Sequence, residues 1–99
     1  MIQSFGARDT EELFVSGYAR RWHPQLCVAA TRKLSILDAA SALQDLAAVQ
    51  SLRLEKLVGK REGTWSIRVN KQWRITFVWG IDGPEGVELS DYHAWHSAS

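Results

Sequence analysis

Residues 64–79 read TWSIRVNKQWRITFVW, and this stretch decides the fold. Apolar residues occupy every second position on both sides of residues 70–72, which is the pattern of two amphipathic β-strands. Both strands must direct their odd-numbered side chains to one face, so opposed residues share parity. The tightest pairing that satisfies this condition sets Val69 opposite Trp73 across a three-residue loop. The stretch is therefore predicted to form a β-hairpin.

This register places Arg68 opposite Arg74 on the polar face of the hairpin. Directly opposed like charges destabilise a strand pair. A bound anion between the two guanidinium groups would relieve the repulsion, and the alternative is that the long side chains splay apart into water. The other face carries the tryptophans and Phe77, which we expect to pack as core rather than to serve as base-stacking platforms.

Alternation in residues 87–92 predicts a third strand, after a turn marked by glycines and a proline. If Trp79 pairs with Val87, Arg74 faces Tyr92, and the two neighbours of Tyr92 in the chain lie at the same end of the sheet. A shift by two residues keeps the same parity and stays open as an alternative.

Two helices are predicted before the hairpin. Asp9 or Thr10 can cap the first helix, which we expect to end near Gly17. The second helix begins with Pro24 in its first turn, and apolar residues then recur at three- and four-residue spacing. It is predicted to run to about residues 42–45.

The order of elements predicts an α+β fold. Residues 1–5 are short enough for an N-terminal edge strand, and residues 52–63 are expected to form a loop before the three-stranded antiparallel meander. A chain of 99 residues fits one domain. We assign residues 1–93 to that domain and residues 94–99 to a short C-terminal tail.

Several classes of protein are disfavoured by the composition. No apolar run approaches the roughly 20 residues of a membrane span, and residues 1–5 lack the features of a secretory signal, so a cytoplasmic protein is expected. The single cysteine, Cys27, cannot form an internal disulfide and is interpreted as a small buried residue. His93, His96, His23 and Cys27 do not follow a recognised metal-ligand spacing, so neither a metal nor a cofactor is expected.

Charge is unevenly distributed along a chain of net charge +1. Residues 51–75 contain two glutamates, Glu55 and Glu62, against seven basic residues: Arg53, Lys56, Lys60, Arg61, Arg68, Lys71 and Arg74. Such a basic block can indicate a surface that binds phosphate groups. The alternative is an ordinary solvated loop and strand face.

Three ordered motifs carry a family resemblance: RLEKLVGKREGTWSI at residues 53–67, VNKQWRITF at 69–77 and DYH at 91–93. With the N-terminal residues 1–5 and LDAA at 37–40, they make the chain resemble the HigB toxins, also called plasmid-maintenance killer proteins, of the RelE/ParE superfamily. The resemblance covers nearly the whole chain.

The resemblance implies a RelE-like fold, with helices packed on a curved antiparallel sheet. It implies an endoribonuclease (mRNA interferase) that cleaves messenger RNA in the ribosomal decoding site. It also implies a HigA-like antitoxin with a helix-turn-helix, usually encoded beside the toxin. The free toxin would be a monomer without membrane association, and a heterotetramer with the antitoxin is compatible with the family.

One departure from the family pattern concerns the catalytic residues. In well-studied HigB toxins the position of Glu55 holds a catalytic histidine, and the position of Val58 can hold a lysine. The chain is in this respect closer to the GraT-like subgroup, whose toxicity is milder. A slow or weak cleavage activity is therefore expected.

Metal-free RNA cleavage needs a base for the ribose 2′-hydroxyl, cations for the charge on the phosphorane, and an acid for the leaving 5′-oxygen. Arg68 and Arg74 suit the phosphate, because a planar guanidinium makes bidentate contacts. Tyr92 is expected to orient the nucleotide. His93 is suited to proton transfer near neutral pH.

The base is predicted to be Asp91 or Glu55, although a carboxylate is a weak base unless its site raises the pKa. For Glu55 a surface or salt-bridge role is favoured over catalysis. Candidate contacts to the RNA backbone, which can equally be solvated, are Arg53, Lys56, Lys60, Arg61 and Lys71.

Two alternatives to the ribonuclease stay open. One is a binding module on the same fold that blocks the ribosome or gyrase without cutting RNA. The other is a weak toxin that acts mainly on ribosome assembly. The terminal Asp91-Tyr92-His93 favours the ribonuclease, whereas the missing histidine at position 55 supports the alternatives.

Overall fold

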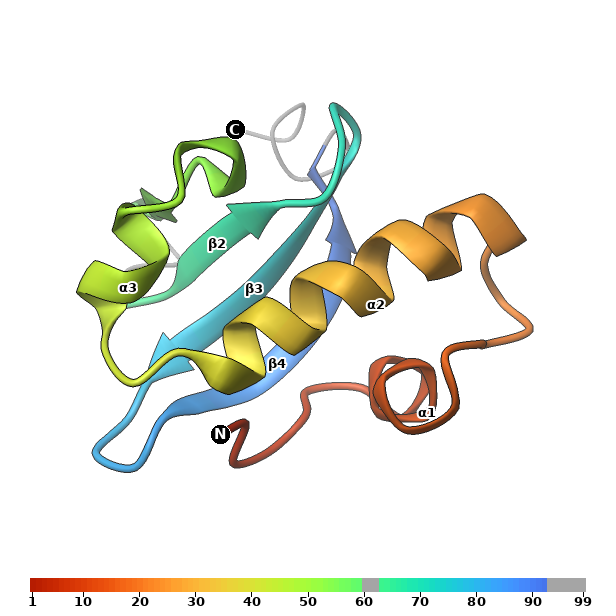
Figure 1. Ribbon diagram of the computed structural model, residues 1–99, viewed down its shortest axis with the longest axis horizontal. Coiled ribbons are helices and arrows are strands. Elements are labelled where there is room, and N and C mark those ends of the chain that lie inside the picture. The colour runs from red at the N-terminus through yellow and green to blue at the C-terminus, as the bar shows by residue number, and fades with distance from the viewer. Residues whose placement is uncertain (60–62, 93–99) are drawn as a thin grey trace.

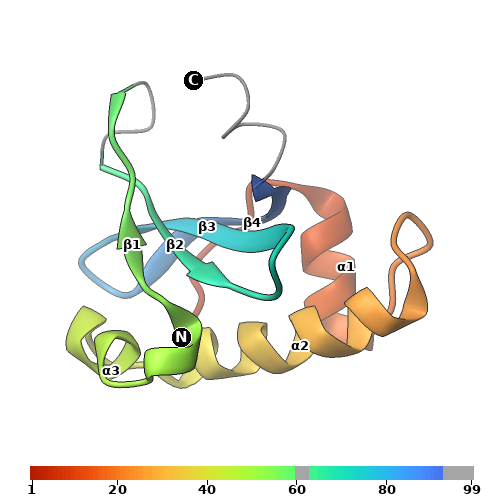
Figure 2. The same cartoon turned by 90° about the horizontal axis from the view of Figure 1, so that it is seen from above.

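Helices cover one face of an antiparallel sheet in the computed structural model, which describes residues 1–59 and 63–92 (Figure 1). In chain order the elements are α1 (Arg8–Ser16), α2 (Pro24–Ala39), α3 (Leu43–Ala47), the 3-10 helix η1 (Gln50–Leu52), β1 (Glu55–Lys56), β2 (Trp65–Arg68), β3 (Trp73–Trp79) and β4 (Pro84–Asp91). The sheet has the order β1-β2-β3-β4 with antiparallel neighbours. Figure 2 shows α2 running along one side of the sheet. The predicted α+β fold is confirmed.

The hairpin of β2 and β3 has the predicted register. Ile67 pairs with Ile75 and Arg68 pairs with Arg74. The loop closes where the Val69 amide donates to the Trp73 carbonyl at 2.9 Å. Inside the loop, the Asn70 side-chain oxygen accepts from the amides of residues 72 and 73, at 2.8 Å each. This side-chain turn explains why a three-residue connection is sufficient.

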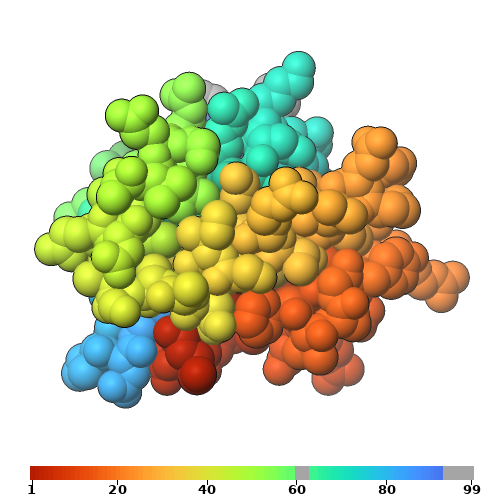
Figure 3. All heavy atoms as spheres, viewed as in Figure 1, coloured from red at the N-terminus to blue at the C-terminus, as the bar shows by residue number. Residues whose placement is uncertain are grey.

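The core lies between α2 and the sheet. Ala30, Leu34 and Leu37, at helical spacing on α2, are fully buried together with Ile67 and Ile75 on the strands. The tryptophans of β2 and β3 are partly buried and pack against this core, as predicted. In the space-filling view the atoms of α2 and α3 hide the middle of the sheet (Figure 3).

The second helix is shorter than predicted. It ends at Ala39, and Ala40 has an extended backbone instead of continuing toward residues 42–45. The Asp45 carboxylate accepts from the Ser41 and Ala42 amides at 2.8 and 3.1 Å. In a continuous helix the two amides would donate to backbone carbonyls of the preceding turn. Here the Asp45 side chain accepts both bonds instead, so α2 ends and a new helix, α3, begins. No helix in the described part of the chain is long and apolar enough to cross a membrane.

The first helix ends as predicted but begins differently. Gly17 ends it in the left-handed conformation, with φ of +80°. Neither Asp9 nor Thr10 is the cap, because the helix starts at Arg8 after Ala7, without a side-chain capping bond. Thr10 is instead fully buried, and its hydroxyl oxygen accepts from the Leu89 amide at 3.1 Å. The hydrogen bond between Thr10 and Leu89 therefore links α1 to β4.

The first of the two registers left open for the third strand is wrong, and the alternative shifted by two residues holds where residues 73–76 pair with residues 88–91. Trp79 pairs with Pro84 instead of Val87, and Arg74 pairs with Ser90 instead of Tyr92. The register shifts between residues 76 and 78, which is a β-bulge that a period-two pattern does not reveal. Pro84, the proline of the predicted turn, instead begins β4, where an edge position tolerates its missing N–H.

The ends of the sheet also differ from the prediction. The N-terminal residues form an isolated parallel bridge between Phe5 and Val87 rather than a strand. The amide of Gly6 donates to the Val87 carbonyl at 2.8 Å, so this segment still covers part of the outer edge of β4. At the other edge, β1 lies in the predicted loop, with Glu55 paired to Ser66.

Candidate active site

The face of the sheet away from the helices carries rows of polar residues. Directly opposed residues point to the same side of a sheet, so the pairings define each row. One row runs across all four strands through Glu55, Ser66, Thr76 and Glu88. The next row contains Arg68, Arg74 and Ser90. The two opposed arginines thus lie on the predicted face.

Arg74 is the most buried charged side chain of this face, with 5% exposure. Its Nε donates to the Ser66 hydroxyl at 2.8 Å, and its Nη2 donates to the Ser66 carbonyl at 3.3 Å. Nη2 also donates to the Arg53 carbonyl. The guanidinium therefore joins β2 to the segment before β1 and is held in one orientation.

Arg53 supplies its carbonyl from an unusual backbone conformation. Its φ of +45° makes it the one non-glycine residue with positive φ among residues 1–59 and 63–92. Such a conformation costs on the order of 1 kcal/mol. The charge-assisted hydrogen bond from Arg74 to this carbonyl offsets part of that cost. The Arg53 side chain is exposed, as its predicted contact to RNA requires.

Tyr92 lies against Arg74 even though the two are not directly paired. The guanidinium carbon of Arg74 is 5.4 Å from the centre of the Tyr92 ring, which is a cation–π distance. The Tyr92 amide donates to the Gln72 carbonyl at 2.7 Å, so its position is fixed by the β2–β3 turn. The predicted proximity of the two residues is therefore found on a diagonal rather than across the strands.

The pKa of Arg74 is shifted by its burial and by the charged residues around it. Burial lowers the pKa of the Arg74 guanidinium from its ordinary value, and the charges of Glu55 and then Tyr92 oppose this shift. Arg68 and Arg53 add to the lowering by like-charge repulsion. An arginine stays protonated in proteins, so Arg74 keeps its positive charge although Arg68 and Arg53 are also positive. The negative charge of Glu55 partly balances these three cations.

Arg68 is the more available of the two opposed cations. It is partly buried, and its side chain makes no hydrogen bond or ion pair with the rest of the described chain. A partly desolvated guanidinium beside a second one favours an anion. The arrangement can hold a phosphate through Arg68, while Arg74 adds charge from a fixed position.

The two predicted bases lie on different sides of the sheet. Glu55 is exposed on β1 and shares the face of Ser66 and Arg74. Asp91 pairs with Trp73, so its side chain leaves β4 on the opposite side. The Asp91 carboxylate accepts from the Gln72 side-chain amide at 3.2 Å. Glu55 therefore shares the face of the arginine pair, whereas Asp91 does not.

The remaining predicted site residues are dispersed. Lys56 lies on the helix side of the sheet, with its Nζ 5.8 Å from the centre of the Trp65 ring. Lys71 is exposed in the β2–β3 turn, and Val58 is exposed beyond β1. Three predicted residues lie outside the described residues: Lys60, Arg61 and His93.

Ser66 and Gln72 belong to the site but were not predicted. Ser66 is fully buried and binds the Arg74 guanidinium, and Gln72 contacts both Asp91 and Tyr92. The hairpin register already placed Ser66 on the face of Arg74, so its parity was an available signal. The role of Gln72 depends on the β4 register and had no signal in the sequence.

Comparisons with known proteins identify the family of the chain. A family model described as the RelE-like toxin of the type II toxin–antitoxin system HigB matches residues 4–93. Toxin HigB-1 of Vibrio cholerae is 49% identical over 61 residues, which are 62% of this chain and 60% of that protein. Endoribonuclease HigB of Proteus vulgaris is 35% identical over 94 residues, which are 94% of this chain and 100% of that protein.

The fold and the family match together define a RelE-like toxin of a type II toxin–antitoxin system. Within that class, the chain belongs to the HigB-like toxin family.

Proposed function

We propose that the protein is an endoribonuclease that cleaves messenger RNA on the ribosome and thereby inhibits translation. The observation that carries the proposal is the pair of opposed arginines, Arg68 and Arg74, on the helix-free face, with Tyr92 against the second of them. The similarity to a protein named Endoribonuclease HigB supports the activity. The closeness to the milder GraT-like subgroup stays a prediction.

The proposed reaction is metal-free. A base removes the proton of the ribose 2′-hydroxyl, the 2′-oxygen attacks phosphorus, and the bond from phosphorus to the 5′-oxygen breaks. An acid protonates the leaving oxygen, so the products are a 2′,3′-cyclic phosphate and a 5′-hydroxyl end. Arg68 binds the phosphate, and Arg74 stabilises the developing charge from its fixed position.

The remaining roles follow from position and chemistry. Tyr92 orients the nucleotide beside Arg74, and His93 is the proposed acid because the ordinary pKa of a histidine side chain lies near neutral pH. Glu55 is the preferred base, since it shares the face of the arginines while Asp91 leaves β4 on the other side. A carboxylate base fits the expected slow turnover.

Binding to the ribosome would use basic side chains, of which Arg53 and Lys71 are exposed. Proposed contacts to the RNA backbone are Arg53, Lys60, Arg61 and Lys71. Lys56, on the helix side of the sheet, would contact a different part of the ribosome. We place the toxin in the cytoplasm, where messenger RNA and ribosomes are found.

The proposed protein partner is a HigA-like antitoxin with a helix-turn-helix, encoded beside the toxin gene. The family is one of type II toxin–antitoxin toxins, which supports a protein antitoxin.

The test is cleavage of a defined message on programmed ribosomes, with the chemistry of both new ends mapped. We expect cleavage on the ribosome, a cyclic phosphate and a 5′-hydroxyl. The same message without ribosomes is the control for ribosome dependence. Intact message at saturating toxin would contradict the ribonuclease.

A second candidate is a toxin that binds its target without cutting. The burial of Arg74 favours it, because the Nε and Nη2 donors of this side chain are already used within the protein. Stalled ribosomes that carry intact message would support it, as would inhibition of gyrase supercoiling.

A further inference from the structure

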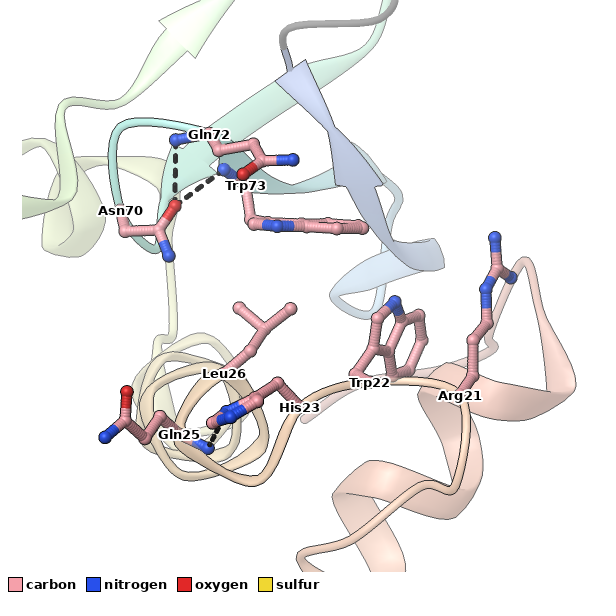
Figure 4. A pocket seen from close by; sticks show the side chains of 8 residues that line it. All are labelled: Arg21, Trp22, His23, Gln25, Leu26, Asn70, Gln72 and Trp73. Atoms are coloured by element: carbon pink, nitrogen blue, oxygen red, sulfur yellow. Dashed lines mark hydrogen bonds between the residues drawn. The ribbon is translucent and has the colours of Figure 1, made fainter.

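The arginine site contains a fully buried hydroxyl group, that of Ser66. Ser66 on β2 pairs with Thr76 on β3, two residues from Arg74, so the side chains of all three leave the sheet on the same face. This is the helix-free face, because Trp73, the neighbour of Arg74, points toward Leu26 on the helix side (Figure 4). Ser66 is 0% exposed. A buried hydroxyl costs free energy unless it is hydrogen-bonded, and here its partner is Arg74.

Arg74 uses most of its hydrogen-bond donors within the protein. An arginine side chain carries five N–H groups. Nε of Arg74 donates to the Ser66 hydroxyl at 2.8 Å, and Nη2 donates to the Ser66 carbonyl at 3.3 Å and to the Arg53 carbonyl. These three bonds use the hydrogen of Nε and both hydrogens of Nη2. The two hydrogens of Nη1 are therefore left for a ligand.

Nη1 of Arg74 is also the nitrogen that a ligand can reach. It makes no hydrogen bond within residues 1–59 and 63–92. In that part of the chain, the buried side-chain nitrogen and oxygen atoms without a partner are Trp22 Nε1 and Thr31 Oγ1. Nη1 is not one of them, so it keeps contact with solvent. Arg74 therefore contacts a phosphate through this one nitrogen, and not through the bidentate edge of Nε and Nη2.

The Ser66 hydroxyl fixes the direction in which Nη1 points. The two carbonyls that accept from Arg74, those of Ser66 and Arg53, both bind Nη2. Bonds to one nitrogen leave the planar guanidinium free to turn about it. The hydroxyl binds a different nitrogen, Nε, and this second point of attachment prevents the turn. A donor that is held in place before charge develops stabilises that charge without reorganisation.

We propose that Ser66 is a positioning residue for RNA cleavage. Its hydroxyl holds Nε of Arg74, so that Nη1 points to the phosphate on which charge develops. The inference rests on the proposed ribonuclease and adds to it a residue that acts through Arg74. Ser66 has no exposed surface with which to touch RNA, and Arg68 still binds the phosphate when the hydroxyl is removed. Loss of the hydroxyl therefore slows the chemical step and leaves binding of the message unchanged.

The test compares Ser66→Ala with Thr10→Ala in single-turnover cleavage of a message on programmed ribosomes. Both residues are 0% exposed and each hydroxyl accepts from an N–H, but the Thr10 hydroxyl binds the Leu89 amide instead of Arg74. We expect Ser66→Ala to lower the maximal rate at least about tenfold. The toxin concentration that gives half of that rate should stay within about twofold. Thr10→Ala should cleave at the unaltered rate.

Two further variants separate positioning from a general loss of structure. Ser66→Thr keeps the hydroxyl and should cleave within about threefold of the unaltered toxin. In the Arg74→Ala background, Ser66→Ala should change the remaining rate by less than about twofold, because it then has nothing to position. An undiminished rate in a folded Ser66→Ala protein would overturn the proposal. So would an equal loss from Ser66→Ala with and without Arg74.

A second readout requires no cleavage. The Nε–H resonance of Arg74 should be protected from exchange with solvent in the unaltered toxin and in Thr10→Ala, and exchange should be at least about tenfold faster in Ser66→Ala. An unprotected Nε–H in the unaltered toxin would overturn the positioning role even if Ser66→Ala fails to fold. If the unaltered toxin leaves the message intact, the proposed function and this inference both fail. If the toxin cleaves and Nε–H exchanges freely, only this inference fails.

Discussion

The two faces of β3 are both buried, but different forces bury them. On the helix side, Ile75 and Phe77 are 0% and 1% exposed and contact apolar side chains. On the other side, Arg74 and Thr76 are 5% and 6% exposed and depend on hydrogen bonds. Apolar burial is non-directional and stabilises the fold. The hydrogen-bonded face gains less stability but fixes the position of a charge, and position is what a catalytic site requires.

The largest expected effect is on the apolar face. Phe77→Ala removes a ring that is 1% exposed and leaves a cavity in the core. We expect the free energy of unfolding to fall by about 3–5 kcal/mol, measured by urea denaturation. Val78→Ala is the control, because Val78 is 45% exposed on the same strand; its loss should be below about 1 kcal/mol. Equal losses in the two variants would contradict the assigned core.

A smaller but more specific effect is expected on the polar face. Arg74→Ala leaves the acceptors on Ser66 and Arg53 without their donor, which should lower the free energy of unfolding by about 2–3 kcal/mol. Arg74→Lys restores the positive charge but not the several N–H donors of the planar guanidinium. It should therefore recover less than half of the lost free energy of unfolding. A lysine variant as stable as the natural protein would show that charge alone suffices.

The smallest effect concerns the backbone of Arg53. Arg53→Gly relieves the positive φ of +45° and should raise the free energy of unfolding by about 1 kcal/mol. Arg53→Ala removes the same side chain but keeps a Cβ, so no gain is expected. Equal stabilisation by both substitutions, in thermal or urea denaturation, would instead assign the effect to the side chain.

Sequence reasoning succeeded where local patterns restrict the structure. The hairpin could be predicted because shared parity and a three-residue loop leave one compact register, which brings Arg68 opposite Arg74. The pattern left two registers of β4 open, because a shift by two residues keeps the same parity. The bulge near Val78 then changes the pairing of residues 78 and 79 without changing the alternation of residue types. The helix break at Ala40 also depends on a side chain five residues later, that of Asp45.

The sequence predicted which residues belong to the candidate site better than it predicted how they are arranged. The strand patterns supplied the two arginines and Tyr92, the family resemblance supported their roles, and the structure brings them together on one face. The burial of Arg74 was not predictable, since its acceptor on Arg53 lies in a segment with no periodic pattern. The separation of Glu55 from Asp91 follows from pairings that need the three-dimensional sheet.

The helix-free face of the sheet is proposed to cut RNA. This proposal is tested most directly by the single-turnover rate of message cleavage on ribosomes for Arg68→Ala, with Arg32→Ala on the helix side as the matched control. We expect Arg68→Ala to lower the rate about 100-fold, with the free energy of unfolding unchanged within about 1 kcal/mol. Arg32→Ala should cleave at the natural rate. An undiminished rate in a folded Arg68→Ala protein would contradict the claim.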